Sequence, residues 1–285
     1  NGSSNARQLS VNSANNLFSG NWSITHTAGG NGLALLRTGA AKALGTGCVT
    51  VGLRAQLIND TAAGLDSLSG VILNGLSSSL VLNQPWNKTT ASLALTGGSP
   101  LVQLGNAASS IGNLIGSVGI IQGTGSSSKL TVNQTSDGYY SGKLGASVSF
   151  TKSGPAALAL AGTVDPSLKL TLAQGTLSLV NLPVTIASLN QTGGVLEIAL
   201  PTSENAPLTV SGNMARSGGS LLVQLPAGPL AFATPYRIVA YQGALTGQPS
   251  ITFSAPVNAT IDYGSGSNSV ISVIFHDPVV LTISN

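Results

Sequence analysis

Seven Asn-x-Ser/Thr triplets are the clearest chemical signal in this sequence. Such a triplet accepts an N-linked glycan when its middle residue is not proline, a condition that all seven meet. Five of them end in threonine, where roughly two are expected from the composition under the same rule. We therefore expect N-glycosylation on exposed turns, because a glycan has no room inside a packed layer. The candidate acceptors are Asn1, Asn21, Asn59, Asn87, Asn133, Asn190 and Asn258.

The eight acidic residues are too dispersed to indicate a catalytic pair. Only Asp60 with Asp66, and Glu197 with Glu204, lie close together in the sequence. Cleavage of a glycosidic bond uses two carboxylates on either side of that bond, and proton abstraction needs a positioned base. We therefore expect that the protein is not an enzyme and has no catalytic residue. A polysaccharide-active β-helix enzyme is the less favoured alternative, since residues distant in sequence can meet on one face of a fold.

Histidine and cysteine do not form a metal-ligand set. His26 and His276 stand far apart, and Cys48 is the single cysteine. A structural zinc site uses four ligands of these types at short spacings. The sequence therefore predicts no metal and no cofactor. For Cys48 we expect a small apolar side chain within a strand, with an intermolecular disulfide or a reactive thiol as the alternatives.

Charge is low and evenly spread along the sequence. Charged residues make up 7% of the 285 residues and hydrophobic residues 42%, so the chain has enough apolar surface to fold. The net charge of +3 comes from eleven Lys and Arg residues scattered over the whole length. Nucleic-acid binding needs clustered cations, so we expect no such partner. Weak charge repulsion favours assembly with further copies of the chain.

The sequence contains no segment typical of a membrane span. No run of 18 apolar residues occurs, so no transmembrane segment is predicted. The sequence begins with Asn rather than Met, which we interpret as the mark of a processed, secreted product. Together with the glycosylation triplets, this predicts a secreted protein that is extracellular or at the cell surface.

Short strands, punctuated by Gly, Ser-Gly, Asn-Gly and Pro, are predicted for most of the chain. Alternation of Leu, Val and Ile with polar residues is typical of strands with one buried face, and the aromatic content of 4% favours a narrow core. Residues 33–44 and 109–116 are the exceptions, since each has the composition for one or two helical turns. The strands predicted in the C-terminal half are 146–151, 157–161, 168–172, 176–180, 184–187, 195–200, 208–211, 221–225, 236–241, 250–253, 259–262, 270–275 and 279–283.

An internal repeat indicates how these strands are arranged. The phrase Gly193-Gly-Val-Leu-Glu-Ile-Ala-Leu-Pro201 returns twenty-five residues later as Gly218-Gly-Ser-Leu-Leu-Val-Gln-Leu-Pro226. A weaker echo relates residues 70–84 to residues 119–134. Repeats of this period are typical of stacked architectures, in which each unit buries its apolar face against its neighbours.

The repeat predicts an all-β parallel β-helix, or solenoid, that forms a single domain. Residues 1–50 are expected to form a less regular N-terminal cap, and residues 51–285 a solenoid continuous with it. β-Sandwich domains are the alternative, because their short strands have similar spacing.

Segment 221–247 carries the phrase Tyr236-x-Ile-Val-x-Tyr241-x-Gly-x-Leu-Thr-Gly247 after a Gly-rich strand pair. In this it resembles the late turns of extracellular β-helix proteins of the autotransporter-passenger kind. The resemblance is confined mainly to the C-terminal third and rests on structural residues. It implies an adhesin, a stalk or a fibre-like display platform, and it carries no catalytic position.

The favoured function is a structural subunit of a secreted, N-glycosylated fibre or sheath that assembles with itself through β-rich ends. The C-terminal apolar segment either completes its own sheet or pairs with a neighbouring copy. An adhesin, or a glycan- or ice-binding β-helix module, is the alternative; it requires a ladder of Thr on one face, whereas Thr171, Thr185 and Thr209 look scattered. The predicted assembly residues are Val279, Val280, Leu281, Thr282 and Ile283.

Overall fold

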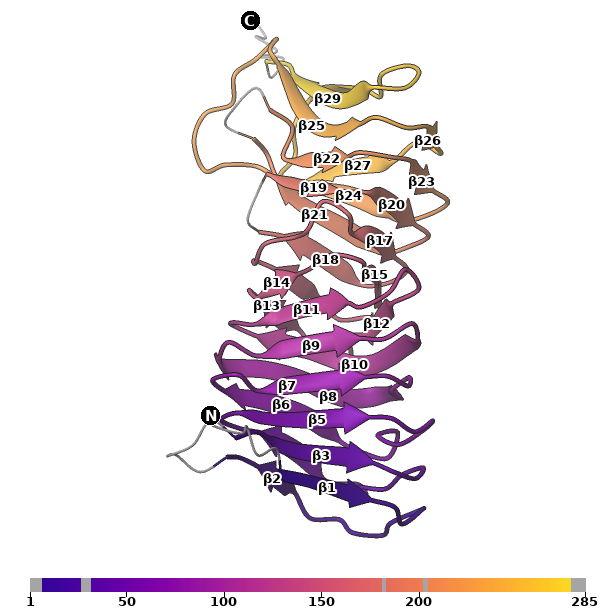
Figure 1. Cartoon of the computed structure of the whole chain (residues 1–285). Coiled ribbons are helices and arrows are strands. Elements are labelled where there is room, and N and C mark those ends of the chain that lie inside the picture. Colours follow the sequence, from indigo (N-terminus) through magenta and orange to yellow (C-terminus); the bar gives the residue numbers. More distant parts are fainter. Residues whose placement is uncertain (1–6, 27–31, 181–182, 202–204, 278–285) are drawn as a thin grey trace, which may run out of the picture.

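The chain folds into an elongated parallel β-solenoid. The computed structural model describes residues 7–26, 32–180, 183–201 and 205–277. In these residues every regular element is a strand, and the strands stack along one axis from the N-terminal to the C-terminal end (Figure 1). The predicted all-β parallel solenoid is therefore confirmed.

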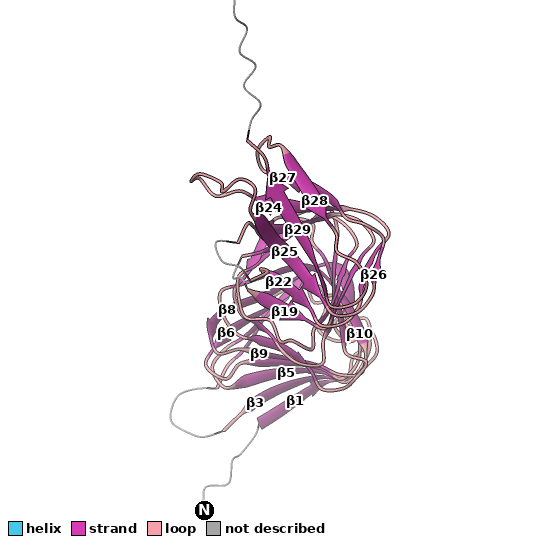
Figure 2. Ribbon diagram, turned by 90° about the horizontal axis from the view of Figure 1, so that it is seen from above, coloured by secondary structure: helices cyan, strands magenta, loops and turns pink. Residues whose placement is uncertain are grey.

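Most strands pair in parallel with a strand one turn earlier and a strand one turn later. In these parallel pairs, the distance in sequence between paired residues varies from 19, between Leu170 and Leu189, to 31, between Met214 and Leu245. The strands stay in register although the number of residues per turn varies, because the extra residues lie in the bends between strands. A view along the axis shows strands on several sides of the coil, joined by loops (Figure 2).

A first sheet forms one face of the N-terminal half. All of its neighbouring strands are parallel. Its strands, in spatial order, are β1 (Arg7–Val11), β3 (Ala34–Thr38), β5 (Ala55–Asn59), β7 (Ser79–Leu82), β9 (Leu101–Leu104), β11 (Ile120–Gly123) and β14 (Lys143–Leu144).

A second sheet runs the full length of the solenoid and divides into two faces. Its undivided part comprises β2 (Trp22–Ile24), β4 (Cys48–Val51), β6 (Gly70–Gly75), β8 (Asn87–Gly98) and β10 (Ala108–Gly116). Strand β10 pairs at its start with β12 and at its end with β13, so the sheet bends between them. One face then holds β12 (Lys129–Asn133), β15 (Ser149–Ser153), β17 (Lys169–Leu172), β20 (Ser188–Gln191), β23 (Met214–Arg216) and β26 (Leu245–Thr246). The other holds β13 (Gly138–Tyr140), β16 (Leu158–Leu160), β18 (Thr176–Leu179), β21 (Val195–Ala199), β24 (Ser220–Gln224) and β27 (Ser250–Phe253).

A third sheet closes the C-terminal part of the coil. Strands β19 (Val184–Ile186), β22 (Leu208–Val210) and β25 (Pro235–Tyr241) continue the parallel stack. Strands β29 (Ser269–Phe275) and β28 (Ala259–Asp262) then add to β25 in antiparallel fashion. The reversal of chain direction occupies the edge of β25 on which a further parallel turn would pair.

The core is a set of apolar columns inside the coil. Along the first sheet, Leu36 pairs with Leu57, Leu57 with Leu80, and Leu80 with Val102, and all four side chains are buried. The two faces of the second sheet contribute further Leu, Val and Ile positions, with Phe150 and Tyr140 as buried aromatic residues. Burial of these columns in every turn supplies the main driving force for folding.

The sequence repeat corresponds to two consecutive turns of the coil. Strand β21 pairs in register with β24, Val195 with Ser220 and Ile198 with Val223. The glycines before these strands belong to a ladder of four, Gly154, Gly175, Gly194 and Gly219, with φ of 74°, 70°, 68° and 77°. A Cβ on any of the last three would lie 2.4 Å from the carbonyl oxygen of the preceding glycine of the ladder. The Gly-Gly pairs of the repeat thus reflect a left-handed bend with backbone stacked closely on both sides.

Both helix predictions are wrong. Residues 109–116 lie in β10, where Ser109 and Ile111 point inward and the strand pairs with β8 and β12. Residues 33–44 contain β3 and a following turn. Pairing on both edges and burial of one face outweigh the weak helical propensity of these segments.

The weaker sequence echo does not match the architecture. Segments 70–84 and 119–134 start on different sheets, β6 on the second and β11 on the first, so the weaker echo does not mark equivalent turns. Within residues 7–50, β1 and β2 already pair within the two long sheets. Antiparallel pairing occurs at the C-terminal end, in β28 and β29.

The glycine ladder gives a test of this account. We expect Gly194→Ala to lower the free energy of unfolding by about 2 to 4 kcal/mol, because it combines a positive φ with a backbone clash. Gly228→Ala is the matched control, since a Cβ there meets nothing within 4 Å, and it should be nearly neutral. Urea unfolding monitored by circular dichroism measures both; equal effects would contradict the ladder.

Candidate functional site

One outer face of the solenoid carries a straight column of hydroxyl groups. Ser110 pairs in register with Thr131, Thr131 with Thr151, and Thr151 with Thr171. We call these four residues the hydroxyl column. Because adjacent strands lie about 4.8 Å apart, the hydroxyl groups repeat at that spacing along the solenoid axis.

Strand alternation places this column outside the coil. In β12, Leu130 and Val132 flank Thr131 and are buried, and in β17, Leu170 and Leu172 flank Thr171 in the same way. Neighbouring side chains of a strand point to opposite faces, so the threonine between two buried residues must face outward. β-Branched threonine also suits an extended backbone.

A second column runs beside the hydroxyl column on the same face. It consists of Lys129, Ser149, Lys169 and Ser188, which pair in register across β12, β15, β17 and β20. We call it the lysine column. Both lysines are exposed, and the described residues contain no ion pair that involves either of them. They stand on alternate turns, about 10 Å apart.

The hydroxyl column is free to bind an external group. Within the described part of the chain, no hydrogen bond occupies the side chains of Ser110, Thr131, Thr151 or Thr171. The column continues in register to Asn87 at one end and Asn190 at the other, and both side chains are exposed. The face therefore offers donors and acceptors of hydrogen bonds in a line, with ammonium groups alongside.

Buried polar side chains fix the bend behind this face. Lys152 points inward, and its Nζ donates hydrogen bonds to the carbonyl oxygens of Ser153, Gly154 and Gln174 at 2.8, 2.9 and 2.9 Å. Burial lowers the pKa of Lys152 to about 8. The side chain ties the bend of its own turn to that of the next, which holds the outer columns in line.

Two turns later, Gln191 also ties the bend of its own turn to the next turn. Its Nε2 donates to the carbonyl oxygen of Gly194, at 3.1 Å, and to that of Ser220 in the next turn, at 3.0 Å. At another bend, Asn59 Nδ2 donates to the carbonyl oxygens of Gln84 and Pro85. Buried donors of this kind satisfy carbonyl groups that a strand would otherwise pair.

Asn59 is therefore not an exposed acceptor for a glycan. Its side chain is 0% exposed, and its Oδ1 also accepts a hydrogen bond from Thr38 Oγ1. The expectation that all seven triplets lie on exposed turns is wrong for this position, because the amide is needed inside the bend.

The other acceptor positions differ in their surroundings. Asn21 and Asn258 lie in loops and are exposed. Asn87 and Asn190 are exposed within strands, at the two ends of the hydroxyl column, and Asn133 is half-buried at the end of β12 on the same face. Asn1 lies outside the described residues, as do the assembly residues Val279 to Ile283.

The remaining chemical groups are not brought together. Asp60 pairs with Arg37, Asp66 Oδ1 accepts a hydrogen bond from the backbone N–H of Asn87, and Glu197 Oε1 accepts one from Gln224. Among residues 7–26, 32–180, 183–201 and 205–277, no group of three His, Cys, Asp or Glu side chains is placed to hold a metal ion. Cys48 is a half-buried free thiol in β4, and burial raises its pKa. In the same residues, no helix is long and apolar enough to cross a membrane.

Sequence reasoning missed the hydroxyl column, although a signal for it is present. The tetrapeptides Lys129-Leu-Thr-Val132, Ser149-Phe-Thr-Lys152 and Lys169-Leu-Thr-Leu172 share the pattern polar, apolar, Thr, then an inward residue. Their spacing of about one turn would have aligned the threonines. Lys152 obscured the pattern, since a lysine is rarely expected at an inward position.

Comparison with known proteins gave no family for this chain. No protein-family model matches it, and no curated protein matches its sequence. Segment 221–247 contains β24, β25 and β26.

The burial of Asn59 leads to a prediction about glycan occupancy. When the chain is secreted from a eukaryotic host, we expect the exposed Asn258 to be glycosylated and Asn59 to be unmodified in the folded product. Site-resolved mass spectrometry of the folded, secreted fraction measures both positions. A glycan on Asn59 in folded protein would show that this bend is open in solution.

Proposed function

We propose that this chain is a non-catalytic binding module that holds an extended polysaccharide along the hydroxyl and lysine columns. The observation that carries the proposal is the in-register stack of Ser110, Thr131, Thr151 and Thr171 on an outer face. A linear array of hydrogen-bonding groups matches a linear ligand that presents hydroxyl groups along its length.

The composition of the face favours a sugar polymer over ice. A face that orders water as ice requires a flat array of similar small groups in two dimensions. Here the neighbouring column alternates Lys129 and Lys169 with Ser149 and Ser188. The ammonium groups are long, mobile and strongly hydrated, which suits contact with acidic or neutral sugars instead.

The same face supports a binding role over catalysis. Its outward side chains across β12, β15, β17 and β20 are hydroxyl, amide and ammonium groups. Cleavage of a glycosidic bond would need two carboxylates beside the sugar chain.

Secretion to the extracellular space or cell surface is part of the proposal, and the Asn-x-Ser/Thr triplets support it. Glycans on Asn87 and Asn190 would stand at the two ends of the hydroxyl column. A glycan on Asn133 would cover its middle, because Asn133 lies two residues from Thr131 on the same face. The proposed ligand therefore requires Asn133 to be free.

A triple substitution tests the binding proposal. We expect Thr131→Val, Thr151→Val and Thr171→Val together to weaken polysaccharide binding by at least about tenfold, since each loses a hydrogen-bonding group without changing shape. The control is Thr185→Val with Thr209→Val, a pair stacked in register on the third sheet. Affinity electrophoresis against a panel of acidic and neutral polysaccharides gives the measurement. Absence of binding to the whole panel, or equal binding by the triple variant, would overturn the proposal.

A fibre or sheath subunit is the second candidate function. In the described residues, β1 pairs only with β3, and its other edge carries free backbone groups. Leu9 in the middle of β1 is 55% exposed, although it lies in register with the buried Leu36. An edge of this kind favours pairing with a second copy of the chain.

Negative-stain imaging and sedimentation test the fibre proposal. We expect polymers that persist at low concentration and are lost in Leu9→Arg, because a charge at the centre of β1 prevents close pairing of the edge. Deletion of residues 279–285 tests donation of the C-terminal segment; unchanged polymers would exclude it. Monodisperse rods at high protein concentration would contradict the fibre proposal altogether.

A further inference from the structure

A buried arginine near the C-terminal end has no partner for its charge within the described part of the chain. Arg216, at the end of β23, is 6% exposed. Its Nε, Nη1 and Nη2 atoms are all buried, and none donates a hydrogen bond within the described residues. Burial lowers the pKa of Arg216 to about 10, so the guanidinium remains charged at neutral pH. An isolated buried charge is costly, because it loses its hydration without gaining hydrogen bonds from the protein.

In earlier turns, the buried polar side chains of the same inward column have hydrogen-bond acceptors. Arg216 pairs in register with Gln191, in the inward column that also holds Lys152. Lys152 and Gln191 each donate to a carbonyl oxygen in the following turn, that of Gln174 and that of Ser220. Arg216 stands in the same column, but no carbonyl oxygen of the described residues accepts a hydrogen bond from its guanidinium. The described part of the chain therefore does not supply here the acceptor that it supplies to Lys152 and Gln191.

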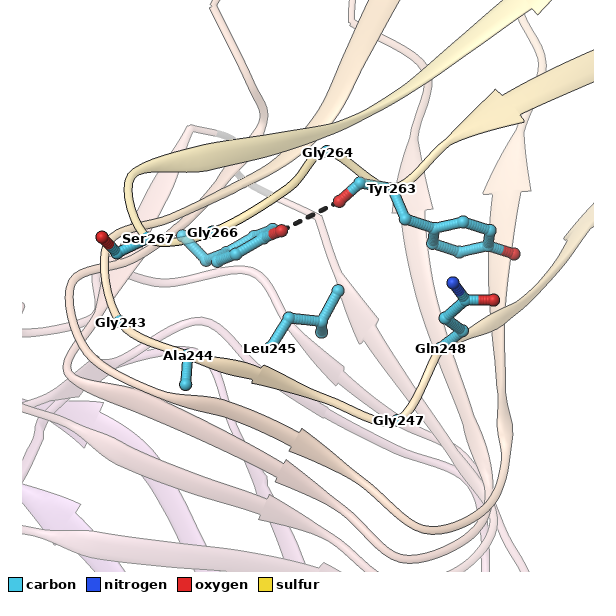
Figure 3. A pocket seen from close by; sticks show the side chains of 10 residues that line it. Gly243, Ala244, Leu245, Gly247, Gln248, Tyr263, Gly264, Gly266 and Ser267 are labelled. Atoms are coloured by element: carbon cyan, nitrogen blue, oxygen red, sulfur yellow. Dashed lines mark hydrogen bonds between the residues drawn. The ribbon is translucent and has the colours of Figure 1, made fainter.

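A cavity occupies the space beside the following turn. It has a volume of about 540 Å³ and lies between the glycine-rich loop 243–248 and residues 263–267 (Figure 3). In the figure, Leu245 and Gln248 extend into the space between these two loops. No acidic residue lines it.

The backbone of Arg216 lies directly behind the wall of this cavity. Gly247, which lines it, is so close that an added Cβ would be 2.0 Å from the carbonyl oxygen of Arg216. Tyr263 also lines it and interacts electrostatically with Arg216. The hydroxyl groups of the two lining tyrosines are already used, Tyr241 Oη donating to Tyr263 O and Tyr263 Oη to Pro249 O. The guanidinium of Arg216, in contrast, has no acceptor among the described residues.

We propose that the cavity and Arg216 form a binding site for a small carboxylate, of the size of a sugar acid. A carboxylate matches the planar fork of a guanidinium with two parallel hydrogen bonds. The cavity volume suits a single monosaccharide-sized ligand. Entry of the carboxylate to the guanidinium requires a shift of the cavity wall. In the lining segment 263–267, Gly266 has open space around it, since an added Cβ there would meet nothing within 4 Å.

This site is separate from the hydroxyl column and does not rest on the binding function proposed for that face. The hydroxyl column lies on the outer surface of β10, β12, β15 and β17, whereas the cavity lies beyond β23, beside β26.

Paired ligands and a paired variant test the proposal. Calorimetry and thermal unfolding should show saturable binding of millimolar D-glucuronate by the whole chain, with a rise in Tm. D-Glucose, in which a hydroxymethyl group replaces the carboxylate, should give neither effect. Arg216→Met should weaken glucuronate binding by at least about tenfold, as expected for loss of a charge-assisted pair. Arg237→Met, at an exposed arginine of β25, should bind glucuronate as the native chain does.

The stability of the variant adds a second readout. In carboxylate-free buffer, Arg216→Met should have a Tm no lower than that of the native chain, because an apolar side chain replaces an unpaired buried charge. A lower Tm would mean that Arg216 has a partner within the protein, which overturns the proposal. Equal responses to glucuronate and glucose, or undiminished binding by Arg216→Met, would overturn it as well.

Discussion

Parallel stacking in register is the constraint on which the whole structure depends. Each strand lies directly over the strand of the previous turn, so a residue type repeated once per turn becomes a continuous column. Leu36, Leu57 and Leu80 form such a column inside the coil, and Thr131, Thr151 and Thr171 form one outside it. A slip of one residue would exchange the two faces of a strand and expose its core residues, which is why the register holds although turns differ in length.

The bends between strands need specific residues to keep this regular stacking. A tight bend stacked closely on another leaves no room for a side chain, and Gly175, Gly194 and Gly219 meet that requirement with positive φ. It also leaves carbonyl groups turned inward, which Lys152 and Gln191 satisfy with buried donors. Arg216 lies in the same column as these two residues but has no acceptor among the described residues, and it stands near the place where the parallel coil gives way to an antiparallel hairpin.

The surface follows from the same geometry. Because the core needs only the inward positions, the outward positions of each turn are free to vary, and on one face they repeat as hydroxyl and ammonium groups. With so few charges in the chain, the two exposed lysines of that face stand among neutral neighbours. A rigid coil with evenly spaced polar groups is suited to a long ligand, whereas the cavity beside Arg216 is suited to a short one.

The sequence by itself determined the fold class, the repeat and most of the C-terminal strands, since alternation and glycine spacing are local patterns that a reader can count. The helix predicted for residues 109–116 was wrong because pairing on both strand edges outweighs their helical propensity. The exposed acceptor predicted at Asn59 was wrong because the Asn-x-Thr triplet carries no information about burial. The tertiary structure alone decided which residues stand above one another. That information is absent from local patterns, because turns of unequal length change the spacing between equivalent residues from one turn to the next. The hydroxyl column, the antiparallel end and the position of Arg216 all depend on that register, so they can be recognised only from the tertiary structure.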